Sequence, residues 1–161
     1  MVEVKFFDQA LDSDLTFAVI AARYEDRWLL CRHRDRQTWE MPGGHREPGE
    51  SIYQTAQREL LEETGVAECQ LEAVSAYGVY TEDGQRTYGG LFFAEVEELG
   101  HRPEGSEIAE NRLMEGLPEH HMTYPDIQPV LLQRVQQRGG QVLAQVVAVG
   151  GDILGHHDQL L

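Results

Sequence analysis

One segment of the chain predicts a helix with a marked start and a marked end. Ser51 is suited to the N-cap, and Gln54, three residues later, completes a capping box. A stripe of apolar residues then recurs at intervals of four: Ile52, Ala56 and Leu60. Gly65 follows where a left-handed C-cap residue is expected. These signals predict a helix between Ser51 and Gly65 that buries one side.

Most of the remaining regular segments are predicted to be strands. Apolar alternation and β-branched residues mark six ranges: 2–7, 15–23, 27–33, 70–81, 86–97 and 108–115. A second helix, bounded by proline, is predicted at 125–138. Strands on both sides of a central helix, with a late helix added, indicate an α/β fold with a mixed β-sheet and helices on its faces.

Two short connections carry turn signals. Tyr24-Glu25-Asp26 is expected to join the strands at 15–23 and 27–33. After a short extended piece at Trp39–Met41, the tripeptide Pro42-Gly43-Gly44 is typical of a break in regular structure. Glycine permits a sharp turn and a close approach of the backbone to a ligand or metal, so a loop is expected here.

The length of the chain is that of one domain. We predict a domain over residues 1–140 and a C-terminal tail over 141–161, where a strand, a helix and a homodimer contact remain open alternatives. The N-terminus mixes charged with apolar residues and no apolar run reaches transmembrane length, so no signal peptide or membrane attachment is expected. Cys31 and Cys69 form no CxxC pair, which favours a cytoplasmic location.

The net charge of the chain is −15, which disfavours nucleic acid as a broad-surface partner. The same charge repels an anionic small molecule unless a cation lies between the two. The basic residues are one lysine and twelve arginines, and half of the arginines fall between Arg23 and Arg46. Arginine presents a planar fork of donors that suits phosphate oxygens, although a compositional bias explains the count equally well.

Three carboxylates are predicted to share one face at the end of the helix. Glu59, Glu62 and Glu63 stand at i, i+3 and i+4. Like charges at this spacing repel, and each carboxylate near a helix C-terminus costs roughly 0.3–1 kcal/mol. Taken alone, the triplet is more often a solvated helix end than a site. A bound hard cation such as Mg²⁺ or Mn²⁺ would remove both penalties.

The spacing of the whole segment GHREPGESIYQTAQRELLEETGV, residues 44–66, favours the functional interpretation. Five residues separate Gly44 from Glu50, and seven more precede the group Arg58-Glu59-Leu60. Glu62-Glu63 and Gly65-Val66 then follow, each after one intervening residue. This pattern resembles the box of the Nudix hydrolase superfamily, with nine constrained positions in 23 residues. The lead-in Trp39-x-x-Pro42-Gly43-Gly44 is also typical, and the family's α/β/α sandwich agrees with the predicted elements.

The resemblance implies a metal site in this segment. In MutT-like members the box forms a loop, a helix and a second loop that hold the catalytic metals. Carried over to this sequence, Glu59 and Glu63 would be the main metal ligands, with Glu62 and the carbonyl of Gly44 assisting. The expected cofactor is Mg²⁺, with Mn²⁺ as a substitute.

The resemblance also implies supporting and catalytic roles for residues around the metal site. Arg58 would orient a glutamate of the box and Glu50 would support the site. A glutamate from a late loop often serves as ligand or general base in the family; Glu107 is the best positional match, with Glu110 second. A solvated loop explains both equally well. The general base is therefore expected to be Glu59 or Glu107.

The expected reaction is attack of a metal-activated water on a phosphoanhydride, which converts a nucleoside triphosphate to NMP and pyrophosphate. Three arginines are candidates for phosphate contacts: Arg32, Arg34 and Arg46. Surface solubility explains each of them nearly as well. The partner is thus expected to be a small nucleoside phosphate rather than a nucleic acid or a membrane.

The markers of several subfamilies are missing. The chain has no proline at the offset seen in ADP-ribose hydrolases and no SQPWPFPxS array as in NADH diphosphatases. Tyr80 lies near, but not at, the offset of the tyrosine in diadenosine polyphosphate hydrolases. Elimination favours nucleoside triphosphates. The alternatives are an ADP-ribose or dinucleotide pyrophosphatase on the same scaffold and a non-catalytic nucleotide sensor, which would usually show a decayed box.

The segment LPEHHMTYPDIQPVLLQRV, residues 117–135, resembles the end of a bacterial MutT-like group that acts on 8-oxo-dGTP. One position departs from the pattern. MutT has a purine-reading asparagine just before its final helix, and the nearest match here is Ile127. An apolar side chain supplies no hydrogen bond for discrimination between purines, so only modest selectivity for the oxidised base is expected.

Overall fold

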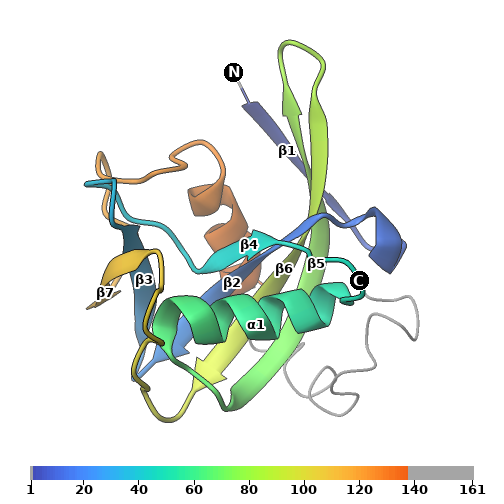
Figure 1. The fold of residues 1–161 in the computed structure, drawn as a ribbon. Coiled ribbons are helices and arrows are strands. Elements are labelled where there is room, and N and C mark those ends of the chain that lie inside the picture. Colours follow the sequence, from blue (N-terminus) through green and yellow to red (C-terminus); the bar gives the residue numbers. More distant parts are fainter. Residues whose placement is uncertain (1, 138–161) are drawn as a thin grey trace.

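The computed structural model describes residues 2–137, and the predicted tail at 141–161 lies outside this range. Within it, strands form a seven-stranded mixed sheet (Figure 1). The strands are β1 (Val2–Phe7), β2 (Phe17–Tyr24), β3 (Arg27–His33), β4 (Gly43–His45), β5 (Cys69–Thr81), β6 (Arg86–Val96) and β7 (Ile108–Met114). Their order is β1-β5-β6-β2-β3-β7, with β4 also paired to β2. The β2–β6 pair is parallel, and the other pairs are antiparallel.

A helix covers each face of the sheet, so the predicted α/β/α sandwich is confirmed. Helix α1 (Ile52–Thr64) packs on one face and the helix at 128–137 on the other. Strand β2 shows the division, because alternate residues point to opposite faces. Ala18, Ile20 and Ala22 belong to the core beneath α1. Val19 and Ala21 belong to the core that includes Leu131 and Leu132.

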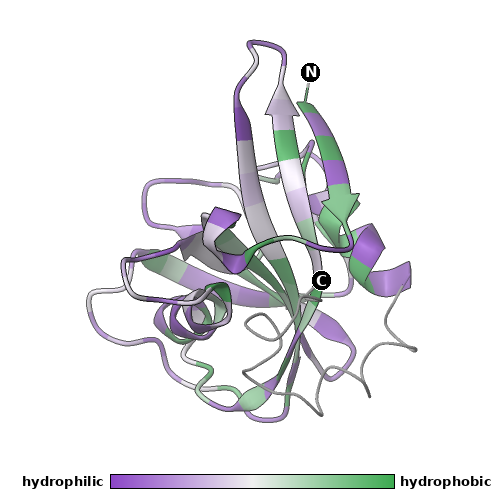
Figure 2. Cartoon of the chain, turned by 90° about the vertical axis from the view of Figure 1, so that its right-hand side faces the viewer, coloured by the Kyte–Doolittle hydropathy of each residue, from purple (hydrophilic) through white to green (hydrophobic). Residues whose placement is uncertain are grey.

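The alternation of apolar and polar residues along β1 is visible in Figure 2. Strand β1 lies at the edge of the sheet beside β5, with Val4 opposite Val79. Val2, Val4 and Phe6 pack against the core that lies under the helix at 128–137, whereas Phe7 packs against the core beneath α1. The strand therefore closes one edge of the sandwich with a half-buried pattern of period two.

Helix α1 begins and ends where the sequence predicts. Ser51 accepts a hydrogen bond from the amide of Gln54, whose side chain accepts one from the amide of Ser51. Gly65 ends the helix with φ +82°. The apolar stripe is buried: Ile52, Ala56 and Leu60. A further contact was not predicted: Asp12, in the short 3-10 helix η1 (Asp12–Asp14), accepts from the amide of Ile52.

The prediction of a loop at Pro42-Gly43-Gly44 is wrong. Gly43 and Gly44 are extended and form strand β4 with His45, paired to β2. The glycines are needed for close approach rather than for a turn. A Cβ on Gly43 would lie 2.3 Å from the carbonyl oxygen of Ala18 on β2. No side chain larger than hydrogen fits there without moving one of the two strands.

Other boundaries differ from the prediction by a few residues. The second helix starts at 128 rather than 125, because residues 125–127 form turns. The amides of Ile127 and Gln128 both bond to the carbonyl of Tyr124 in these turns. The hairpin between β2 and β3 is a two-residue turn in which Glu25 and Asp26 both have positive φ. Among residues 2–137, no helix is both long enough and apolar enough to cross a bilayer.

Candidate active site

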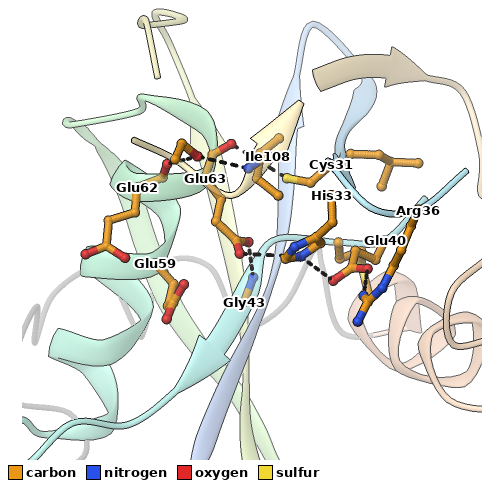
Figure 3. Close-up of polar contacts among 12 residues, drawn as sticks. Cys31, His33, Arg36, Glu40, Gly43, Glu59, Glu62, Glu63 and Ile108 are labelled. Carbon is orange, nitrogen blue, oxygen red and sulfur yellow. Dashed lines mark hydrogen bonds and ion pairs between the residues drawn. The ribbon is translucent and has the colours of Figure 1, made fainter. Parts of the chain in front are cut away.

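The C-terminal half of α1 lies directly against strand β4, and two glutamates meet the glycine backbone there (Figure 3). The Oε1 atom of Glu63 accepts a hydrogen bond of 2.9 Å from the amide of Gly43. A Cβ on Gly44 would lie 2.1 Å from the Oε2 atom of Glu59. Both carboxylates therefore pack against the main chain of β4, and a side chain at Gly44 would displace that of Glu59.

Burial weakens the ionised forms of these two carboxylates. It is the largest cause that raises the pKa of Glu59 to about 7 and that of Glu63 to about 8. Arg58 opposes the shift at Glu59, and the amide of Gly43 opposes it at Glu63. Repulsion from Glu107 adds to the shift at both sites. Arg58 and the amide of Gly43 thus stabilise the negative charges of Glu59 and Glu63 only in part.

A hard divalent cation fits this donor set. Mg²⁺ prefers oxygen ligands and is commonly held by one or two carboxylates together with water and substrate phosphates. Glu63 provides a buried carboxylate and Glu59 a partly buried one, and both lie against the backbone of β4. Within residues 2–137, no three histidine, cysteine, aspartate or glutamate side chains already surround one point. The arrangement is that of an open site rather than a closed structural cage.

Glu62 differs from the other two glutamates of the triplet. Its side chain is about half exposed, with a relative accessibility of 51%, and in Figure 3 it extends away from Glu63 and Gly43. Its Oε1 atom lies 3.3 Å from a guanidinium nitrogen of Arg58. The structure therefore brings two of the three predicted ligands together and leaves Glu62 at the rim.

Arg58 connects the residues of the box. Its guanidinium forms two hydrogen bonds to the carboxylate of Glu50, one of 3.0 Å to Glu59, and one of 2.9 Å to the carbonyl of His45. The hydrogen bonding from Arg58 is the largest cause that lowers the pKa of Glu50 to about 2, so Glu50 is ionised at neutral pH. Through its four contacts, Arg58 also links the start of α1, the last turns of α1 and strand β4.

Glu107 and Arg34 face the same pocket. The pocket has a volume of about 190 Å³ and is lined by His33, Arg34, Asp35, Gly105, Ser106 and Glu107. The amide of Arg34 donates to the carbonyl of Glu107 over 3.0 Å, so the two chain segments are joined through their backbones. Two residues predicted from separate parts of the sequence thus lie side by side. Glu110 instead points toward Arg32 and Arg112.

The other two candidate phosphate-binding arginines have partners within the chain. Arg32 donates to the carbonyl of Arg36 and lies 3.5 Å from Glu110. Arg46 pairs with the carboxylate of Asp12 and also donates to the carbonyls of Asp12, Leu15 and Glu50. These contacts use all three nitrogens of the Arg46 guanidinium. In this structure Arg46 joins η1 to the box and does not line the pocket that contains Arg34.

One group of site residues was missed by the sequence analysis. His33, at the end of β3, places its Nε2 atom 3.2 Å from Glu40 and 3.9 Å from Glu63 (Figure 3). Arg36 donates to the other oxygen of Glu40 over 2.9 Å. Glu40 is buried between Trp39 and Met41, in the segment that leads into Gly43 and Gly44. An acidic residue inside an apolar, extended segment was the available signal.

Comparison with known proteins agrees with the spacing of the box. The model of the NUDIX domain matches residues 13–140. The chain belongs to the Nudix family. Its members are hydrolases that act on phosphoanhydride bonds, so the chain is assigned as an enzyme of this kind.

One relative and two solved structures are similar to this chain. A Bacillus subtilis (strain 168) protein named "Putative 8-oxo-dGTP diphosphatase YtkD" is 27% identical over 146 residues, which are 86% of this chain and 91% of that protein. A crystal structure of the Bacillus subtilis pyrophosphohydrolase BsRppH has a TM-score of 0.72 at 27% identity and covers 86% of this chain and 92% of that chain. A NUDIX hydrolase from Nitrosomonas europaea has a TM-score of 0.58 at 20% identity over 78% of this chain and 88% of that chain, which supports the fold.

Substitution of the adjacent glycines tests how closely the site packs. Alanine at Gly44 meets the flexible end of Glu59, whereas alanine at Gly43 meets the backbone of Ala18. We expect Gly44→Ala to keep the parental unfolding midpoint and to lower Mn²⁺ affinity at least about 10-fold. Gly43→Ala should lower the free energy of unfolding by about 1–3 kcal/mol. Calorimetric Mn²⁺ binding and urea unfolding measure the two effects; equal Mn²⁺ affinity in Gly44→Ala and the parent would contradict this packing.

The stability of the metal-free protein should depend on pH in an unusual direction. Glu59 and Glu63 have folded-state pKa values of about 7 and about 8, above the ordinary value of 4.5. Between about pH 4.5 and 8 the folded state therefore binds more protons than the unfolded state, so the free energy of unfolding falls as pH rises. In EDTA, Glu63→Gln should show a shallower fall than the parent. The exposed loop variant Glu98→Gln is the control, and an identical slope in all three proteins would refute the assignment.

Proposed function

We propose that the chain is a Mg²⁺-dependent pyrophosphohydrolase that converts nucleoside triphosphates, 8-oxo-dGTP among them, to NMP and pyrophosphate. The observation that carries the proposal is the pair of glutamates, the buried Glu63 and the partly buried Glu59, against the glycines of β4. Burial raises the pKa values of both carboxylates, and a bound cation would stabilise their ionised forms. Phosphate oxygens are the usual remaining ligands of such a cation.

Each residue of the box receives a role in this proposal. Glu59 and Glu63 would hold the metal, with Glu62 at the rim and the carbonyl of Gly44 available as a further oxygen. When bound, the metal would polarise the phosphate and lower the pKa of a coordinated water. Arg58 would fix the direction of Glu59 through its 3.0 Å hydrogen bond.

Glu107 is our proposal for the general base. It lies in the pocket beside the metal-binding face, it is exposed, and its charge acts on both Glu59 and Glu63. It would accept the proton of the attacking water, because an ionised carboxylate at hydrogen-bond reach of that water is what the step requires. Arg34, on the wall of the same pocket, would contact a phosphate oxygen.

The choice of a triphosphate rests on the relatives and on missing subfamily markers. The relative that covers most of this chain is named for 8-oxo-dGTP. Ile127 packs against the core cluster around Leu131 and offers apolar contact without a side-chain hydrogen bond. A site that does not hydrogen-bond the distinguishing group of a purine discriminates weakly. Selectivity for 8-oxo-dGTP over dGTP should therefore be modest.

A substrate panel tests the proposal. The protein is incubated at equal concentrations of dGTP, 8-oxo-dGTP, ADP-ribose and diadenosine tetraphosphate, with Mg²⁺ or with EDTA, and the phosphate products are identified. We expect pyrophosphate from both dGTP forms only with Mg²⁺. Glu63→Gln should lose at least about 10-fold in turnover, and Glu98→Gln should retain it. Faster release of AMP from ADP-ribose would replace the triphosphate assignment with that of an ADP-ribose or dinucleotide pyrophosphatase, and no turnover of any substrate would favour a nucleotide sensor.

A further inference from the structure

The last turn of α1 leaves main-chain carbonyls without partners inside the helix, as every helix end does. Their partners in this chain can be traced one by one. The carbonyl of Leu61 accepts from the amide of Gly65 over 2.8 Å. The carbonyl of Glu62 accepts from the hydroxyl of Ser106 over 2.9 Å. The carbonyl of Glu63 accepts from the side-chain amide of Asn111 over 3.0 Å and from the thiol of Cys31 over 3.8 Å. Two of these four donors, Ser106 and Asn111, come from one distant segment.

That segment runs from 100 to 111, through the loop after β6 and into the first residues of β7, and we call it the strap. Figure 1 shows it passing the C-terminal end of α1. Contact between the two is close at Gly65 and Gly100. A Cβ on Gly65 would lie 2.4 Å from the main chain of His101, and a Cβ on Gly100 would lie 2.1 Å from the carbonyl oxygen of Gly65. The strap therefore packs backbone against backbone on the end of the helix.

Both donors are held in place by the strap itself. The hydroxyl of Ser106 accepts from the amide of Ile108 over 3.2 Å, which directs its proton toward the carbonyl of Glu62. The side-chain oxygen of Asn111 accepts from Arg102 over 2.6 Å, and Arg102 also donates to the carbonyl of Ala109. With its oxygen occupied, the amide of Asn111 presents its NH₂ group to α1. The orientation of each donor is thus defined before it meets the helix.

The same strap carries Glu107, between Ser106 and Ile108. The carbonyl of Glu107 is bonded to the amide of Arg34, so its backbone is fixed to the end of β3 as well as to α1 through Ser106. Ser106 therefore connects the end of α1, which carries Glu59 and Glu63, to the segment that carries Glu107. The helix end that supplies Glu59 and Glu63 and the loop that supplies Glu107 cannot shift independently while this bond is intact.

We propose that Ser106 and Asn111 are positioning residues, whose bonds to the last carbonyls of α1 set the distance between the Glu59–Glu63 pair and Glu107. The inference rests on the proposed function, because it assumes that this pair holds a divalent metal. Outer hydrogen-bond partners of metal-binding side chains commonly change affinity 10- to 100-fold when removed. A helix cap alone would affect stability and leave metal affinity unchanged.

Removal of one hydroxyl separates the two roles. Ser106→Ala deletes the bond to Glu62, and Ser106→Thr retains a hydroxyl and serves as the rescue. Ser75→Ala is the matched control, because the hydroxyl of Ser75 also bonds main-chain carbonyls, those of Phe7 and Ala76, on the β1–β5 side of the sheet. Mn²⁺ binding is measured without substrate by electron paramagnetic resonance, together with urea unfolding. We expect roughly 10-fold weaker Mn²⁺ binding in Ser106→Ala, and parental binding in Ser106→Thr and Ser75→Ala.

A second variant tests the other donor. Asn111→Asp replaces the NH₂ group by an oxygen that faces the carbonyl of Glu63, so Mn²⁺ binding should weaken more than in Ser106→Ala. If Ser106→Ala loses stability but binds Mn²⁺ like the parent, the residue is only a helix cap and the inference is wrong. If the parent itself binds no Mn²⁺, the proposed function fails at its metal site. The two failures are therefore distinguishable.

Discussion

The contact between two glutamates of α1 and the glycines of β4 is the constraint on which the proposed active site depends. A Cβ on Gly44 would displace the carboxylate of Glu59, and the amide of Gly43 donates a hydrogen bond to the buried carboxylate of Glu63. Burial of ionised groups without a full countercharge costs free energy, which the raised pKa values express. The fold holds this arrangement because α1 is fixed independently, by its caps and by its apolar stripe.

The sheet provides the second half of that arrangement. Strand β2 pairs along one edge with β6, whereas its other edge is shared by β4 near Phe17 and β3 near Tyr24. Because β3 leaves β2 after a short pairing, β4 can enter beside Ala18 and bring its glycines under α1. Small residues on β2, Ala18 and Ala22, allow the helix to lie close to the sheet. The site is thus positioned by main-chain pairing rather than by a flexible loop.

Local features of the sequence predicted the helix and its carboxylates well. A capping box, an apolar stripe and a C-cap glycine depend on residues within a few positions of one another, so spacing alone defines them. Strand β4 was mistaken for a loop because glycine pairs have two uses, and only the neighbouring strand decides between them. His33, Ser106 and Asn111 were missed for the same reason. Their partners, Glu63 and Glu62, lie more than 25 positions away in the chain.

The distribution of arginine contacts bears on how a chain of net charge −15 would bind the proposed nucleoside triphosphate. Arg58 is committed to Glu50 and Glu59, and Arg46 to Asp12. Within residues 2–137, the guanidinium of Arg34 is paired with no carboxylate, and it faces the pocket that contains Glu107. One exposed cation cannot balance a triphosphate chain beside three glutamates. In the proposed function the remaining positive charge would be supplied by a divalent cation between the glutamates and the phosphates, which is how an acidic protein would bind an anionic substrate.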